Sequence, residues 1–149
     1  MITLTPASLR TAVLAGIASA LLAACATPPP DGPLRPETMV AITDQMELIK
    51  FNAGRPHQVL ERKLVSGLAT GESLMGIDYR VAKGVLYALS SAGRLYTVDT
   101  ASGKLSPVNA TATALPFAGG PIGFDFNPTV DLIRVVTPAG DNLRLHPDP

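Results

Sequence analysis

The sequence repeats itself at a spacing of 47 residues, and this repeat constrains the fold more than any other feature. The clearest matches relate residues 76–79 (GIDY) to 123–126 (GFDF), and 91–93 (SAG) to 138–140 (PAG). Further matches at the same spacing pair Ala41 with Ala88, Ile42 with Leu89, and Leu48 with Leu95. In the last copy we expect one inserted residue, so that Leu143 corresponds to Leu95. Three copies indicate that one supersecondary unit is used repeatedly.

The complete middle copy contains four short segments typical of β-strands, at residues 73–79, 85–90, 94–99 and 104–109. Apolar and β-prone residues alternate in these segments, and glycines stand where hairpin turns need a positive φ. Four antiparallel strands in about 47 residues match the blade of a β-propeller. We therefore predict an all-β fold of antiparallel four-stranded blade repeats. Three strands of a first blade are expected in residues 38–66, and three of a last blade in 121–147.

The number of repeats is small for a closed propeller, which needs about four blades or more. Residues 38–149 encode roughly two and a half copies of the unit. The chain could be truncated, several copies could assemble, or the strands could form an open sheet with exposed edges. Exposed edges invite aggregation. We favour truncation and expect a partial, β-propeller-like domain.

The N-terminal segment is typical of a secretory signal peptide. One cation, Arg10, precedes an apolar run at residues 11–22 that falls short of the roughly 20 residues a membrane span needs. The following residues 22–25 (LAAC) resemble the lipobox of bacterial lipoproteins and end on the only cysteine of the chain. We predict removal of residues 1–24 and lipidation of Cys25. Under the alternative, an ordinary signal peptidase cleaves nearby and Cys25 has no role.

Residues 25–37 are expected to join the lipidated cysteine to the repeat domain at residues 38–149. Residues 27–36 contain five prolines, which favour an extended and semi-rigid tether. Ala26 stands where an aspartate would retain a lipoprotein in the inner membrane. The sorting rule of Gram-negative lipoproteins therefore indicates the outer membrane, and we expect the domain on its periplasmic face.

Two aspartates, Asp78 and Asp125, occupy the same place in two repeats, and each is followed by an aromatic residue. They could surround a central channel as ligand or metal carboxylates. Alternatively, each carboxylate accepts hydrogen bonds from backbone N–H groups at a strand end within its own blade. We favour the second interpretation, because architectural residues recur in every repeat whereas active sites seldom do.

A possible calcium loop has oxygen-bearing side chains at alternate positions, namely Asp125, Asn127, Thr129 and Asp131. Calcium loops carry glycine at the sixth position and a bidentate glutamate at the twelfth. Valines occupy both positions in this chain, at Val130 and Val136. Because Asn-Pro is typical of turns, we favour a hairpin turn at residues 127–128.

Other chemistry has little support in the sequence. The 12 basic and 12 acidic residues balance, which argues against nucleic-acid binding. The two histidines, His57 and His146, lie in different repeats without metal-ligand spacing, and neither a G-x-S-x-G elbow nor a phosphate loop occurs. We therefore expect no catalytic residue, cofactor or metal ligand. Four arginines are expected on solvated faces, with Arg134 able to reach an aspartate across the sheet: Arg80, Arg94, Arg134 and Arg144.

Residues 71–99 and 123–145 resemble an uncharacterised bacterial family, domain of unknown function 4394, and residues 41–52 fit its N-terminal part. The resemblance implies a propeller-like fold and members that continue beyond this length. It implies no substrate, cofactor or catalytic residue.

These patterns together predict a lipid-anchored cell-envelope domain that works as a non-catalytic binding or scaffolding module. The expected partners are the membrane, through Cys25, and a protein or small-molecule ligand, with no nucleic acid. One alternative is a propeller enzyme, similar to lactonases or dehydrogenases, whose active site lies in missing blades. Another is a truncated remnant without function.

Overall fold

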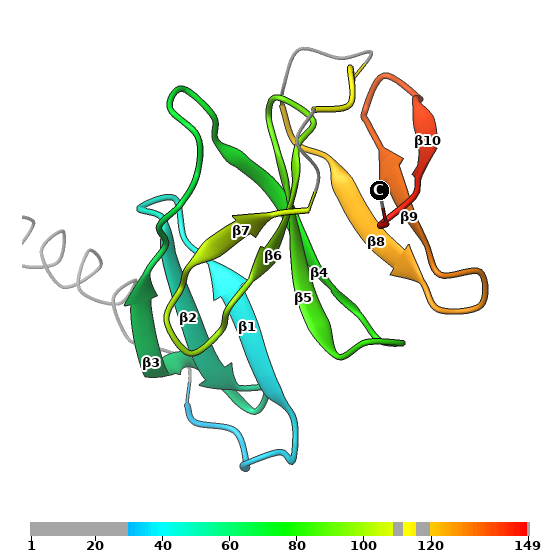
Figure 1. The fold of residues 1–149 in the computed structure, drawn as a ribbon. Helices are drawn as coiled ribbons and strands as arrows, with labels where there is room; N and C mark the ends of the chain where they lie inside the picture. The colour runs from blue at the N-terminus through cyan, green and yellow to red at the C-terminus, as the bar shows by residue number, and fades with distance from the viewer. Residues whose placement is uncertain (1–29, 109–111, 116–119, 149) are drawn as a thin grey trace, which may run out of the picture.

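The computed structural model describes residues 30–108, 112–115 and 120–148 (Figure 1). Within these ranges the chain forms three antiparallel sheets and contains no helix, which confirms the predicted all-β class. The described residues accordingly contain no helix that could span a membrane. The predicted signal peptide and Cys25 lie outside the described residues.

Each sheet is a meander in which consecutive strands are neighbours. The first sheet contains β1 (Thr38–Ile42), β2 (Glu47–Asn52) and β3 (Arg55–Leu64). The middle sheet contains β4 (Leu74–Arg80), β5 (Val85–Ser90), β6 (Leu95–Val98) and β7 (Leu105–Pro107). The last sheet contains β8 (Gly123–Asn127), β9 (Leu132–Val136) and β10 (Asn142–Leu145). All the predicted strands are present, but none of the three sheets is closed.

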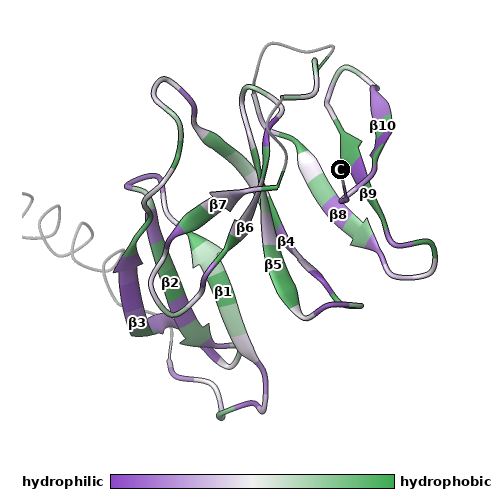
Figure 2. Ribbon diagram, viewed as in Figure 1, coloured by the Kyte–Doolittle hydropathy of each residue, from purple (hydrophilic) through white to green (hydrophobic). Residues whose placement is uncertain are grey.

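The middle sheet is buried on both faces because it lies between the other two (Figure 1). Successive side chains of a strand point to opposite faces, so β5 contributes to two cores. Leu86 and Ala88 pack in a cluster with Leu48 of the first sheet. Tyr87 and Leu89 pack in a second cluster on the other face, together with residues of β8 and β9. Hydrophobic residues accordingly cover β5, whereas β3, at the outer edge of the first sheet, is largely hydrophilic (Figure 2).

The cross-strand register repeats at the 47-residue spacing through all three sheets. The pair Leu89 and Leu95 in the middle sheet recurs as Ile42 and Leu48 in the first sheet. It recurs again as Val136 and Asn142 in the last sheet.

The expected insertion in the last copy is therefore wrong, because Asn142, not Leu143, corresponds to Leu95. The turn that precedes these residues also has one length in both copies. Ser90 N–H donates to the Arg94 carbonyl at 2.9 Å, and Thr137 N–H donates to the Asp141 carbonyl at 3.1 Å.

The shared register shows which strands are equivalent. Strands β1 and β2 correspond to β5 and β6, and β8 to β10 correspond to β4 to β6. Within the described ranges, the first sheet therefore lacks a counterpart of β4, and the last sheet lacks a counterpart of β7.

Candidate functional site

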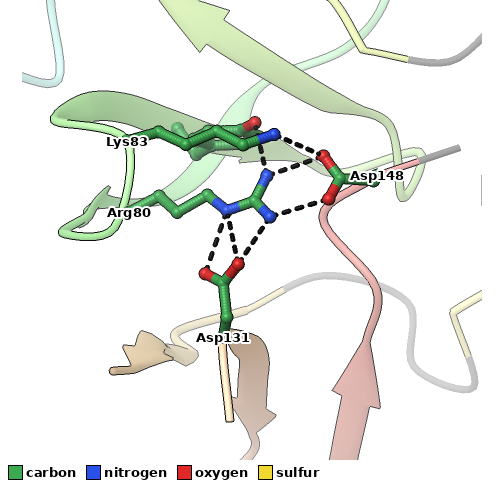
Figure 3. A network of polar contacts seen from close by, with 5 residues as sticks. Arg80, Lys83, Asp131 and Asp148 are labelled. Atoms are coloured by element: carbon green, nitrogen blue, oxygen red, sulfur yellow. Dashed lines mark hydrogen bonds and ion pairs between the residues drawn. The ribbon is translucent and has the colours of Figure 1, made fainter. Parts of the chain in front are cut away.

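A group of paired charged side chains lies where the middle and last sheets meet (Figure 3). Arg80, the last residue of β4, is only 3% exposed. Its Nε donates to Asp131 Oδ1 at 2.9 Å and its Nη2 to Asp131 Oδ2 at 2.6 Å. The other side of the guanidinium bonds the Asp148 carboxylate, with both N–O distances at 2.7 Å. Nη1 also donates to the Tyr87 hydroxyl at 3.3 Å, so all five donors of Arg80 have an acceptor.

The expectation that Arg80 lies on a solvated face is wrong. A buried guanidinium needs counter-charges, and Asp131 and Asp148 supply them from the last hairpin and the C-terminal segment. Hydrogen bonds from Arg80, and for Asp148 also from Lys83, hold the pKa of both carboxyls below the usual range. The group therefore acts as a joint that holds the middle sheet against the last one, because the Arg80 guanidinium bonds carboxylates of the same domain.

Asp131 reaches Arg80 because of its place in the β8–β9 turn. It has a φ of 52°, and its counterpart in the β4–β5 turn is Gly84, with a φ of 65°. Both residues donate their N–H to the strand end before the turn, at 2.9 Å in each case. Aspartate tolerates this left-handed conformation better than most residues with a side chain. Asp131 could therefore have been singled out from the sequence, because it occupies the repeat position that Gly84 occupies in the middle sheet.

A second polar cluster lies at the opposite end of β4 around Glu72, whose side chain is 8% exposed. Arg94 Nε donates to Glu72 Oε1 at 3.2 Å, and the Tyr96 hydroxyl donates to Oε2 at 2.9 Å. Burial works to raise the pKa of Glu72, but hydrogen bonds from Ser90, Tyr96 and Arg94 together lower it. Burial and the bond to Glu72 raise the pKa of Tyr96. Arg94 is therefore also paired and not simply solvated.

Asp78 joins the first strands of two neighbouring sheets. Its Oδ2 accepts a hydrogen bond of 2.7 Å from the backbone N–H of Phe126 on β8. Asp78 thus accepts a backbone N–H as predicted, but the expectation that the donor lies in its own blade is wrong, because Phe126 belongs to the next sheet. Asp125, the equivalent residue of β8, is exposed and lies opposite Arg134 of β9 in the register.

A groove separates β1 of the first sheet from β4 of the middle sheet. One cavity of about 310 Å³ is lined by residues that include Ile42, Asp44, Met46 and Ile77. A second cavity, of about 170 Å³, continues along β1 and is lined by residues that include Val40, Ile77 and Tyr79. Because Ile77 lines both, the two cavities are neighbouring parts of one groove.

The comparison with known families matches residues 47–149 to the family described as Domain of unknown function (DUF4394). The chain belongs to this family. No curated protein and no solved structure matches it.

The DUF4394 chain does not bring the predicted calcium-loop oxygens together as a metal site. Asn127 Oδ1 accepts from Thr129 N–H at 2.9 Å, which confirms the turn at residues 127–128, and Asp131 bonds Arg80. In the described part of the chain, no group of three or more His, Cys, Asp or Glu side chains could hold a metal ion. His57 lies on β3 of the first sheet and bonds Asp31, whereas His146 directly follows β10 of the last sheet, so the two histidines are associated with different sheets.

Proposed function

We propose that this DUF4394 protein is a lipid-anchored module of the cell envelope that binds or scaffolds other molecules. The lipobox-like residues 22–25 and the proline-rich residues 27–36 support the anchor and the tether. Cys25 is followed by Ala26 and not by an aspartate, which supports placement at the outer membrane, on its periplasmic side. We also infer a propeller-like arrangement of the three sheets, supported by the common 47-residue register and the repeated packing of one sheet on the next.

The binding role is supported above all by how the chain uses its charged groups. Arg80, which is 3% exposed, and Glu72, whose side chain is 8% exposed, both bond partners inside the domain. These bonds fix the positions of neighbouring strands and sheets. A fixed stack of sheets presents loops and strand edges in a defined geometry, which is the arrangement that binding modules use.

The anchor is tested by substituting the single cysteine in the full chain. Wild-type protein and Cys25→Ser are expressed in a Gram-negative host with an alkyne analogue of palmitate, and membranes are separated from soluble fractions. We expect label and membrane attachment for wild type, and loss of both for Cys25→Ser. A matched control, Ser19→Ala, changes a small residue in the same leader and is expected to keep the label. Membrane retention of Cys25→Ser would overturn the proposed anchor.

A further inference from the structure

Among the residues that the structure describes, the first sheet has no counterpart of the strand that begins each of the other two sheets. That strand has a common pattern, Gly-apolar-Asp-aromatic, at residues 76–79 of β4 and 123–126 of β8. It pairs antiparallel with the strand that follows it, so that Asp78 lies opposite Tyr87 and Asp125 opposite Arg134. In the first sheet, β1 corresponds to these second strands and lies at the edge of the sheet.

The edge of β1 presents backbone groups for another strand. Thr43 N–H donates to Glu47 on the β2 side. Because N–H directions alternate along a strand, the N–H groups of Val40 and Ile42 point away from β2. Their counterparts in β5 are Tyr87 and Leu89, which pair with β4. The edge of β1 thus presents backbone N–H donors at the positions equivalent to those through which β5 pairs with β4.

The groove between β1 and β4 provides space at this edge. Its two cavities, of about 310 and about 170 Å³, follow β1 from Val40 to Ile42 and beyond. Their opposite wall is formed by β4, including Ile77 and Tyr79. First strands of adjacent sheets are neighbours elsewhere in the molecule, since β4 contacts β8. The groove therefore lies where the first strand of the first sheet would lie.

The contact between β4 and β8 shows what such a strand must contain. A Cβ atom built on Gly76 would lie 2.5 Å from the Cβ of Phe124, so only glycine permits this close approach. Asp78 accepts the N–H of Phe126 at 2.7 Å. In the repeat, the β4 residues equivalent to Phe124 and Phe126 of β8 are Ile77 and Tyr79, which lie 47 positions earlier. An added strand therefore needs a glycine against Ile77 and an aspartate that accepts the N–H of Tyr79.

We propose that the groove between β1 and β4 binds an extended segment of another polypeptide with the pattern Gly-apolar-Asp-aromatic. The segment adds to the first sheet antiparallel to β1, with its glycine opposite Ile42 and its aspartate opposite Val40. Main-chain hydrogen bonds to β1 give affinity, while the glycine and the aspartate give specificity. The inference deepens the proposed binding function and rests on it.

The test uses the full chain, purified in detergent, and a fluorescent peptide with the sequence of residues 73–80 (SLMGIDYR). Fluorescence anisotropy is expected to show saturable binding. The peptide carrying Gly76→Val is expected to bind at least about tenfold more weakly, because its side chain clashes with Ile77. The peptide carrying Asp78→Leu is expected to lose affinity as well, and a scrambled peptide is expected not to bind.

A protein variant tests the location without relying on the peptide changes. Val40→Pro removes an N–H donor from the edge of β1 and is expected to weaken binding at least about tenfold. Leu64→Pro places proline on β3, at the opposite edge of the same sheet, and is expected to bind as wild type does. Thermal unfolding establishes that both variants are folded. In wild type, the peptide is expected to slow hydrogen exchange at Val40 and Ile42.

Three results would overturn the proposal. The first is a folded chain that does not bind the peptide, and the second is binding that Gly76→Val leaves unchanged. The third is a dimer of the chain alone that the peptide does not disrupt, since a second copy would then occupy the groove. Membrane attachment through Cys25 is measured separately, so failure of the strand site and failure of the anchor are distinguishable.

Discussion

The carboxylate of Asp78 accepts the backbone N–H of Phe126 at 2.7 Å and thereby ties β4 to β8. The two strands also approach closely at Gly76, against which the Phe124 side chain packs. Because an aspartate recurs at this position in two repeats, ligand carboxylates around a channel were one interpretation of the sequence. In the structure, Asp78 instead holds the middle sheet against the last one.

Substitution of Asp78 by alanine is expected to lower the free energy of unfolding by about 1–2 kcal/mol. The Phe126 N–H loses a charged acceptor in a partly buried contact. Urea unfolding measures the effect. The matched control is Asp125→Ala, whose side chain is exposed at the equivalent position and is expected to cost less than about 0.5 kcal/mol. Equal costs for the two variants would contradict the proposed joint.

Substitution of Arg80 by methionine is expected to destabilise the protein by about 2–4 kcal/mol. It removes a buried guanidinium with five satisfied donors and leaves two carboxylates close together. Chemical unfolding of wild type and variant gives the difference. Arg134→Met, on an exposed position of β9, serves as the control and is expected to change stability by less than about 0.5 kcal/mol. A small effect of Arg80→Met would mean that the ion pairs do not hold the sheets together.

Stability is expected to fall as the pH drops below about 4, the ordinary range of aspartate. The pKa of Asp148 is lowered by hydrogen bonds from Arg80 and Lys83, so the unfolded chain takes up a proton before the folded one does. The contribution is present above the unfolded pKa and is lost as the pH falls towards the folded pKa. Thermal melts between pH 2 and 7 would measure it. Asp148→Asn should flatten the acid limb of this profile, and an unchanged limb would exclude Asp148 as its source.

Two equivalent turn glycines are expected to differ in their tolerance of alanine. Gly93 has a φ of 78°, and a Cβ there would lie 1.9 Å from the carbonyl oxygen of Thr113. Gly140 has a φ of 95°, but nothing lies within 4 Å of its Cβ position. Gly140→Ala should cost about 1 kcal/mol from backbone strain alone, and Gly93→Ala should cost more. Melting temperatures of the two variants provide the comparison, and the reverse order would refute the assigned contact.

The strands were predictable because their signals are local. Alternating residues and a turn glycine lie within a few positions of each other, as in residues 85–93, and the strand β5 is found at its predicted bounds. The alignment of the last copy failed at Leu143 because it followed hydrophobicity. Leu95 faces the last sheet in a buried core, whereas Asn142, its true counterpart, is exposed on the outer sheet. Equivalent positions in a repeat need not have equivalent surroundings.

The polar joints were not predictable for a related reason. Arg80 and Asp148 are 68 residues apart, and no local pattern links them. An arginine at the end of an amphipathic strand ordinarily lies in solvent. Its burial follows only when the last hairpin and the C-terminal segment pack over it, which depends on how the sheets stack.

The sequence by itself determined the all-β class, the strand positions and the 47-residue unit, because backbone conformation and side-chain alternation are fixed by near neighbours. It also carries the signals for the predicted lipid anchor. Only the tertiary structure decided that Arg80 is a buried joint, that Asp78 bonds the next sheet, and that a groove follows the edge of β1. These features arise where segments far apart in the chain meet, and there burial and distance, which no single segment encodes, determine the role of each side chain.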